Sequence, residues 1–133
     1  MSTLPRKEIV LIDDDPISNL INKRIIETHF NFKTIVFTDA AKALEQLKQW
    51  LIAEPNVLPE VIFLDIEMPD MNGWEFLDQL HTLPDTLIDK CHVIVLTSSI
   101  DFEDIEKSKT YSVVRNFISK PLTADKLRRL VSY

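Results

Sequence analysis

The feature that most constrains this chain is a buried-strand pattern that ends in a carboxylate. Four consecutive apolar residues, Val61 to Leu64, are typical of a strand buried on both faces, and Asp65 follows at once. A loop containing a proline and the only glycine comes next, and Asn72 is a candidate N-cap for the helix that follows it. Asp65 is therefore predicted at the carboxyl end of a parallel strand, where ligands collect in open α/β sheets.

The same order of strand and acid occurs near the amino terminus. Residues 8–12 predict a buried strand, and Asp13, Asp14 and Asp15 follow it directly. Pro16 suits the first turn of a helix, and the apolar residues after it have the spacing of an amphipathic helix: Ile17, Leu20, Ile21 and Ile25. Asp15 can cap that helix, but three carboxylates cannot all do so. Crowded at a strand end they repel one another, which a shared divalent cation would relieve.

Three more strands complete the pattern, at residues 33–38, 92–96 and 115–119. Helices are expected after each strand, the last two at residues 101–109 and 123–132, while residues 82–90 are expected to form a polar loop around Pro84. Ser99 or Asp101 is the expected N-cap of the 101–109 helix. Five alternations of strand and helix favour a doubly wound α/β domain with a parallel sheet and right-handed crossovers.

Composition limits the functions that this domain can perform. The 133 residues carry a net charge of −6 with no visible basic stripe, which argues against binding to nucleic acid or to an anionic membrane. Apolar runs are too short to span a bilayer and the amino terminus lacks a signal peptide, so we expect a cytoplasmic protein. The single cysteine, Cys91, permits no internal disulfide, and the single glycine excludes both a Walker loop and a dinucleotide fingerprint.

Polar residues at four strand ends form a chemically complementary set. Asp13 and Asp14 can bind a hard cation, Asp65 is free to act, and Thr97 and Lys120 supply a hydroxyl and a positive charge. Magnesium commonly uses one or two carboxylates together with a phosphate oxygen, so the set favours phosphoryl chemistry. A carboxylate can itself be the nucleophile and form an aspartyl-phosphate, and Asp65 is the candidate because its strand is central.

Four segments of the sequence resemble the receiver (response regulator) domain of two-component signalling. They are Leu11-Ile12-Asp13-Asp14-Asp15, Leu64-Asp65-Ile66-Glu67-Met68-Pro69-Asp70-Met71-Asn72-Gly73, Leu96-Thr97-Ser98 and Phe117-Ile118-Ser119-Lys120-Pro121. The resemblance covers nearly the whole chain in order and spacing. It implies a flavodoxin-like fold, with a five-stranded parallel sheet in the order 2-1-3-4-5 flanked by five helices.

The resemblance also assigns roles to individual residues. Asp65 would accept the phosphoryl group in a Mg²⁺-dependent reaction, and Thr97 and Lys120 would hold the phosphoryl oxygens. Asp14 would ligate Mg²⁺ directly, Asp13 largely through water, and Glu67 through its backbone carbonyl, with Asp65 completing the metal site. The Lys120–Pro121 peptide bond would be cis.

The family also implies partners. The phosphoryl donor would be a histidine kinase or a histidine phosphotransfer protein, and an unknown downstream protein would bind the face formed by the fourth helix, fifth strand and fifth helix. The domain would catalyse only its own phosphorylation and dephosphorylation, so it would not be an enzyme acting on other substrates. We expect residues 1–133 to form the receiver domain alone, with no output domain.

Two positions depart from the common pattern of the family. Residues 109–115 replace the frequent Gly-Ala segment before the fifth strand, so a local difference is expected there. The switch aromatic is Phe117 rather than the common Tyr, so its rotamer must be set by packing alone.

Two other functions compete with this one. A phosphatase or phosphotransferase of the haloacid dehalogenase type also uses a strand-end Asp with Mg²⁺, but it usually places a second Asp where this chain has Glu67, and no room remains for a cap domain. A receiver-like adaptor would bind partners without being phosphorylated.

Overall fold

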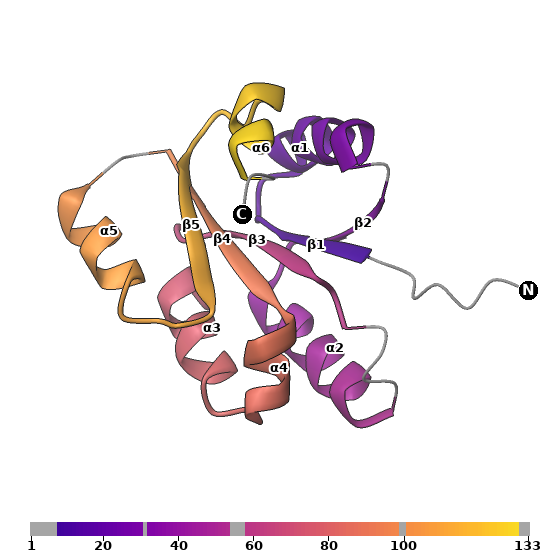
Figure 1. The fold of residues 1–133 in the computed structure, drawn as a ribbon, viewed down its shortest axis with the longest axis vertical. Coiled ribbons are helices and arrows are strands. Elements are labelled where there is room, and N and C mark those ends of the chain that lie inside the picture. Colours follow the sequence, from indigo (N-terminus) through magenta and orange to yellow (C-terminus); the bar gives the residue numbers. More distant parts are fainter. Residues whose placement is uncertain (1–7, 31, 54–57, 99–100, 131–133) are drawn as a thin grey trace, which may run out of the picture.

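The computed structural model describes residues 8–30, 32–53, 58–98 and 101–130, and its strands and helices alternate as expected (Figure 1). Five strands form one parallel sheet in the order β2-β1-β3-β4-β5, which confirms the predicted topology. In chain order the elements are β1 (Glu8–Ile12), α1 (Pro16–Phe30), β2 (Lys33–Phe37), α2 (Ala40–Ala53), β3 (Val61–Asp65), α3 (Gly73–Leu80), α4 (Asp85–Lys90), β4 (His92–Thr97), α5 (Phe102–Ser108), β5 (Val114–Ser119) and α6 (Ala124–Leu130).

Helices cover both faces of the sheet, so its central strands are buried on both sides. Figure 1 shows α1 and α6 on one face and α2, α3, α4 and α5 on the other. Because side chains alternate along a strand, each central strand feeds two separate core clusters. In β3, for example, Ile62 and Leu64 pack under α2 and α3, while Phe63 packs under α1 and α6. This two-sided burial explains the continuous apolar runs of the sequence.

The local signals at helix starts are confirmed wherever the structure describes them. Asn72 and Glu75 form a capping box at α3, since each side chain accepts a hydrogen bond from the backbone N–H of the other residue. Asp101 caps α5, and the Asp15 carboxylate accepts a hydrogen bond from Ile17 N–H at the start of α1. The alternative cap, Ser99, lies outside the described residues.

The prediction of a polar loop over residues 82–90 is wrong, because the short helix α4 lies there. Leu87 is fully buried in the core, and Cys91 N–H donates to the Leu87 carbonyl at the helix end. A helix of 6 residues is too short to show a helical period in the sequence. Residues 8–130 as described therefore contain six helices rather than five, and the predicted fourth and fifth helices are α5 and α6.

The helix α1 is confirmed, but the first part of its predicted apolar stripe faces away from the sheet, and only Ile25, further along the helix, packs against the core. The exposed fractions are 71% for Ile17, 73% for Leu20 and 54% for Ile21, whereas Asn19 is buried. The reason is a hydrogen bond in the interior: the Asn19 side-chain amide donates to the backbone carbonyl of Asp13 at 2.7 Å. Satisfying that buried carbonyl turns Asn19 inward at the start of α1, while the apolar Ile26 is buried further along the helix.

Candidate functional site

Three carboxylates meet at the carboxyl edge of the sheet. Asp13 and Asp14 follow β1, and Asp65 ends β3, its neighbour in the sheet. One oxygen from each carboxylate lies within 4.8 Å of the others. Asp13 and Asp65 are buried, whereas Asp14 is exposed. The predicted acid cluster therefore exists, and it opens to solvent on the side of Asp14.

Backbone hydrogen bonds fix the two buried carboxylates. The N–H of Asp15 donates to Oδ1 of Asp13 at 3.0 Å, and the N–H of Glu67 donates to Oδ1 of Asp65 at 3.1 Å. The Oδ1 atom of each buried acid thus faces its own loop. The Oδ2 atoms of both face the lysine described next.

Lys120 reaches the cluster from the residue after β5. Its backbone N–H donates to the Thr97 carbonyl at 2.7 Å, and its peptide bond to Pro121 is cis, as the family resemblance implies. The ammonium nitrogen lies 2.8 Å from Asp13 Oδ2 and 3.6 Å from Asp65 Oδ2. A positive charge therefore stands between the two buried acids.

Burial and charge shift the pKa values in the cluster. Desolvation by burial, reinforced by the charge of Asp13, raises the pKa of Asp65 to about 6, against the opposing effects of Lys120 and the Glu67 N–H. For Lys120, burial lowers the pKa, but the hydrogen bond to Asp13 and the charges of both carboxylates outweigh burial and raise it above its ordinary value. A cation bound beside Asp65 would therefore stabilise the charged form of its carboxylate.

Two further predicted site residues lie at the same edge. Thr97 ends β4, is 1% exposed, and directly follows Leu96, which pairs with Asp65 in the sheet. Glu67 lies two residues beyond Asp65, and its side chain is exposed while its N–H contacts the Asp65 carboxylate. All the predicted site residues thus come from the loops and strand ends of one edge.

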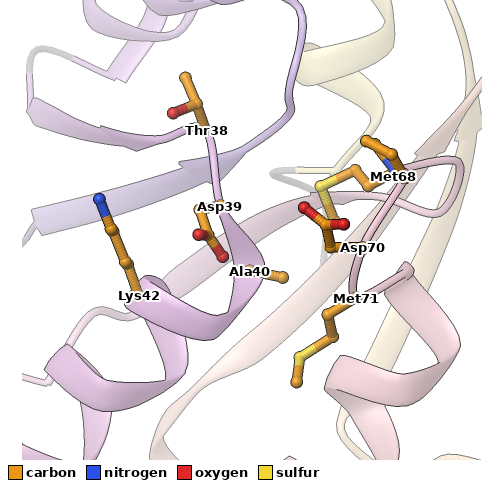
Figure 2. Close-up of a pocket in the computed structure, with 8 residues that line it drawn as sticks. Thr38, Asp39, Ala40, Lys42, Met68, Asp70 and Met71 are labelled. Carbon is orange, nitrogen blue, oxygen red and sulfur yellow. The ribbon is translucent and has the colours of Figure 1, made fainter.

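A hollow of about 280 Å³ adjoins this edge, between the loops that follow β2 and β3. Figure 2 shows Met68, Asp70 and Met71 on one side of it and Thr38, Asp39 and Lys42 on the other. No local sequence pattern predicts this hollow, because its two sides are about 30 residues apart in the chain. Asp39 caps the start of α2, since its carboxylate accepts a hydrogen bond from Ala41 N–H.

The carboxylate cluster fits a hard divalent cation. Its donors are oxygens, which Mg²⁺ prefers, and the exposed position of Asp14 leaves room for the waters that Mg²⁺ retains. The two buried acids crowd each other, so a cation would be electrostatically favoured there. A parallel sheet in the 2-1-3-4-5 order with such a site at its carboxyl edge defines an α/β domain of the flavodoxin-like class.

The chain belongs to the response regulator receiver domain family, whose model matches residues 9–132. Its fold is similar to that of a two-component response regulator from Cytophaga hutchinsonii, with 32% identity, a TM-score of 0.86 and 96% of each chain covered. It is also similar to a two-component response regulator from Legionella pneumophila, with 26% identity, a TM-score of 0.77, and 94% of this chain and 95% of the other covered. Membership of this family excludes the haloacid dehalogenase alternative.

Curated relatives place the same domain in longer proteins. The chain is 34% identical to part of hybrid signal transduction histidine kinase C of Dictyostelium discoideum, with 86% of this chain but 9% of that protein covered. It is 29% identical to a probable C4-dicarboxylate response regulator of Halalkalibacterium halodurans, with 96% of this chain and 51% of that protein covered. The chain thus spans about half or less of these relatives. Among the residues that the structure describes, no helix has the length and apolar character needed to cross a membrane.

Proposed function

We propose that this domain accepts a phosphoryl group on Asp65 and changes its partner-binding surface in response. The observation that carries the proposal is the position of the Asp65 carboxylate, which ends a central strand between the acid pair of β1 and the Lys120 ammonium. A nucleophile needs cationic and hydrogen-bonding groups where phosphoryl charge will develop, and this edge supplies both.

The covalent step forms one bond and breaks one. A carboxylate oxygen of Asp65 attacks phosphorus, an O–P bond forms, and the P–N bond of a phosphohistidine donor breaks. The electron pair of that bond stays with the imidazole nitrogen, which takes a proton from solvent. Lys120 and the Thr97 hydroxyl bind the equatorial oxygens of the transferred group, and Lys120 remains charged throughout because its pKa is raised.

The metal-binding residues in this proposal are the carboxylates of Asp13, Asp14 and Asp65, with the backbone carbonyl of Glu67. Mg²⁺ bound there would neutralise charge on the phosphoryl oxygens and on the crowded acids. Asp13 has a further role in its own right, because its hydrogen bond to Lys120 holds the ammonium beside Asp65.

The donor in this proposal is a histidine kinase or phosphotransfer protein that docks on α1. A protein donor must cover the rim of the site to bring its phosphohistidine to Asp65. The exposed stripe of Ile17, Leu20 and Ile21 begins two residues after the acidic run and provides apolar area for such contact. In this proposal, the outward-facing apolar side chains of α1 form the surface that the donor protein binds.

The downstream partner is proposed to bind the face formed by α5, β5 and α6. Phe102 is 72% exposed on α5, and Phe117 of β5 lines a hollow of about 190 Å³ between β5 and α5. Phe117 pairs with Val95 in the sheet and packs in the same core cluster, so it lies on the same face of the sheet as Thr97, two residues further along β4. A displacement of Thr97 toward the phosphoryl group would free space on that face for Phe117.

The loop before β5 sets the position of α5 in this proposal. Tyr111 stacks on Trp74 of α3 with ring centroids 6.0 Å apart, and its hydroxyl donates to Asp78 at 2.7 Å. Lys107 of α5 lies over the same Trp74 ring, 4.8 Å from its centroid. Tyr111 belongs to the segment that replaces the usual Gly-Ala residues, and Lys107 precedes that segment. Together their contacts hold the end of α5 against α3.

Phosphorylation by a small donor tests the proposed function. Wild-type protein incubated with radiolabelled acetyl phosphate and Mg²⁺ should incorporate label, and Asp65→Asn should incorporate none. Asp70→Asn is the matched control, because it makes the same substitution on an exposed acid of the same loop and should be labelled like wild type. Equal labelling of Asp65→Asn and wild type would overturn the assignment, and an unlabelled wild type would favour the adaptor alternative.

A further inference from the structure

A second lysine, Lys126 of α6, holds the backbone on both sides of Lys120. Its ammonium nitrogen donates to the Ser119 carbonyl at 2.7 Å and to the Pro121 carbonyl at 2.8 Å, and it lies 3.5 Å from the Ser119 hydroxyl oxygen. Two short, charge-assisted hydrogen bonds to the immediate neighbours of one residue restrict the path of that residue.

Lys126 is itself held in place. Its backbone N–H donates to the Thr123 hydroxyl at 3.2 Å at the start of α6, and the next residue, Leu127, is fully buried between α6 and the sheet. The ammonium therefore projects from an anchored helix rather than from a free loop. From the opposite side, the Lys120 N–H is bound to the Thr97 carbonyl of β4 at 2.7 Å.

The backbone at Lys120 is thus restrained from β4 on one side and from α6 on the other. The position of the Lys120 ammonium, 3.6 Å from Asp65, depends on where this backbone lies. Errors of about 1 Å in the placement of a group that binds a transition state are costly to rate.

We propose that Lys126 is a positioning residue for Lys120 in the phosphorylation of Asp65. The inference rests on the proposed function, and it adds a residue that does not touch the acid cluster. Its role is to fix the Ser119–Pro121 backbone so that Lys120 meets the incoming phosphoryl oxygens in the correct place. A purely structural lysine would stabilise α6 without affecting what Lys120 does.

The rate of labelling by acetyl phosphate with Mg²⁺ tests this role. Lys126→Met keeps the aliphatic stem and removes the ammonium, and it should slow labelling by about tenfold. Lys48→Met is the matched control, because it removes the same charge from an exposed lysine of α2, on the other face of the sheet, and should label at the wild-type rate. Lys126→Arg retains charged donors and should recover most of the lost rate.

A double-mutant cycle separates positioning from general stability. If Lys126 acts through Lys120, adding Lys126→Met to Lys120→Met should change the remaining rate by less than about twofold. An equal loss in both backgrounds, or a wild-type rate for Lys126→Met, would overturn the proposal. If the thermal midpoint shows that Lys126→Met is not folded, Lys126→Gln, which keeps an amide donor, replaces it in the same cycle. A wild type that shows no Asp65-dependent label would instead overturn the proposed function, and the inference with it.

Discussion

The ammonium nitrogen of Lys120 lies 2.8 Å from Asp13, a residue 107 positions earlier in the chain, and forms a hydrogen bond with its carboxylate. The distance from the same nitrogen to Asp65 is 3.6 Å, which is an electrostatic contact rather than a hydrogen bond. Lys120 therefore forms its hydrogen bond with Asp13 and makes only an electrostatic contact with Asp65. The carboxylate of Asp65, the proposed nucleophile, accepts no hydrogen bond from this lysine.

Metal binding should depend on Asp14, the exposed member of the cluster. A ligand that binds only the folded state stabilises it by on the order of 1 kcal/mol at a few times its Kd. We expect Mg²⁺ to raise the thermal midpoint of the wild type and scarcely that of Asp14→Ala. Asp15→Ala is the control: loss of its cap on α1 should lower the midpoint, while Mg²⁺ still raises it. Equal Mg²⁺ shifts in wild type and Asp14→Ala would show that the cluster does not bind the metal.

The stabilising contribution of Asp65 to the metal-free domain should be lost as pH rises. The pKa of Asp65 is raised from 3.8 to about 6, so its contribution to the free energy of unfolding is complete below pH 4 and is lost as the folded protein gives up its proton near pH 6. The shift corresponds to about 3 kcal/mol. Urea unfolding in EDTA should show Asp65→Asn gaining stability relative to wild type by up to about that amount between pH 4 and pH 7. A difference that stays constant across this range would mean that Asp65 is not desolvated.

Phosphorylation should change the surroundings of Phe117. We expect a phosphate analogue, beryllofluoride with Mg²⁺, to produce its largest remote amide shifts between Thr97 and Leu122. The reason is that Phe117 pairs with Val95 and therefore lies on the same face of the sheet as Thr97, two residues further along β4, with a hollow beside the aromatic ring. Shifts confined to the loops after Asp13 and Asp65 would indicate a site without this relay. Full partner coupling in Phe117→Ala would remove the aromatic from the mechanism.

The only glycine should tolerate no side chain. A Cβ on Gly73 would lie 2.7 Å from Ile66 Cα and 3.0 Å from the Asp65 carbonyl oxygen, and neither backbone atom can rotate away. We expect Gly73→Ala to destabilise the domain by about 1–3 kcal/mol and to slow phosphorylation, because α3 must move away from the end of β3. Asn72→Ala, which removes the adjacent cap, should cost about 1 kcal/mol with little effect on the labelling rate. An unchanged thermal midpoint for Gly73→Ala would contradict the contact.

Much of the site could be predicted because its residues follow strands that the sequence marks clearly. Asp13 and Asp65 each end a continuous apolar run, and a run of that kind is a local signal that needs no knowledge of the partner strands. The order of the strands came from the family resemblance, since β1 and β3 become neighbours only when the crossover is known. Helix α4 was missed because 6 residues are too few for a period to appear.

The sequence by itself determined where the strands end to within one residue, which residues are candidate helix caps, and that carboxylates, a hydroxyl and a lysine stand at the strand ends. Tertiary structure alone decided which side of α1 faces inward and what Lys126 contacts. A periodic pattern defines two sides of a helix, but the buried Asp13 carbonyl that demands Asn19 exists only once α1 packs on β1. Lys126 likewise contacts Ser119 and Pro121 only when α6 folds back along β5, because its hydrogen bonds depend on that geometry and leave no mark in the local pattern.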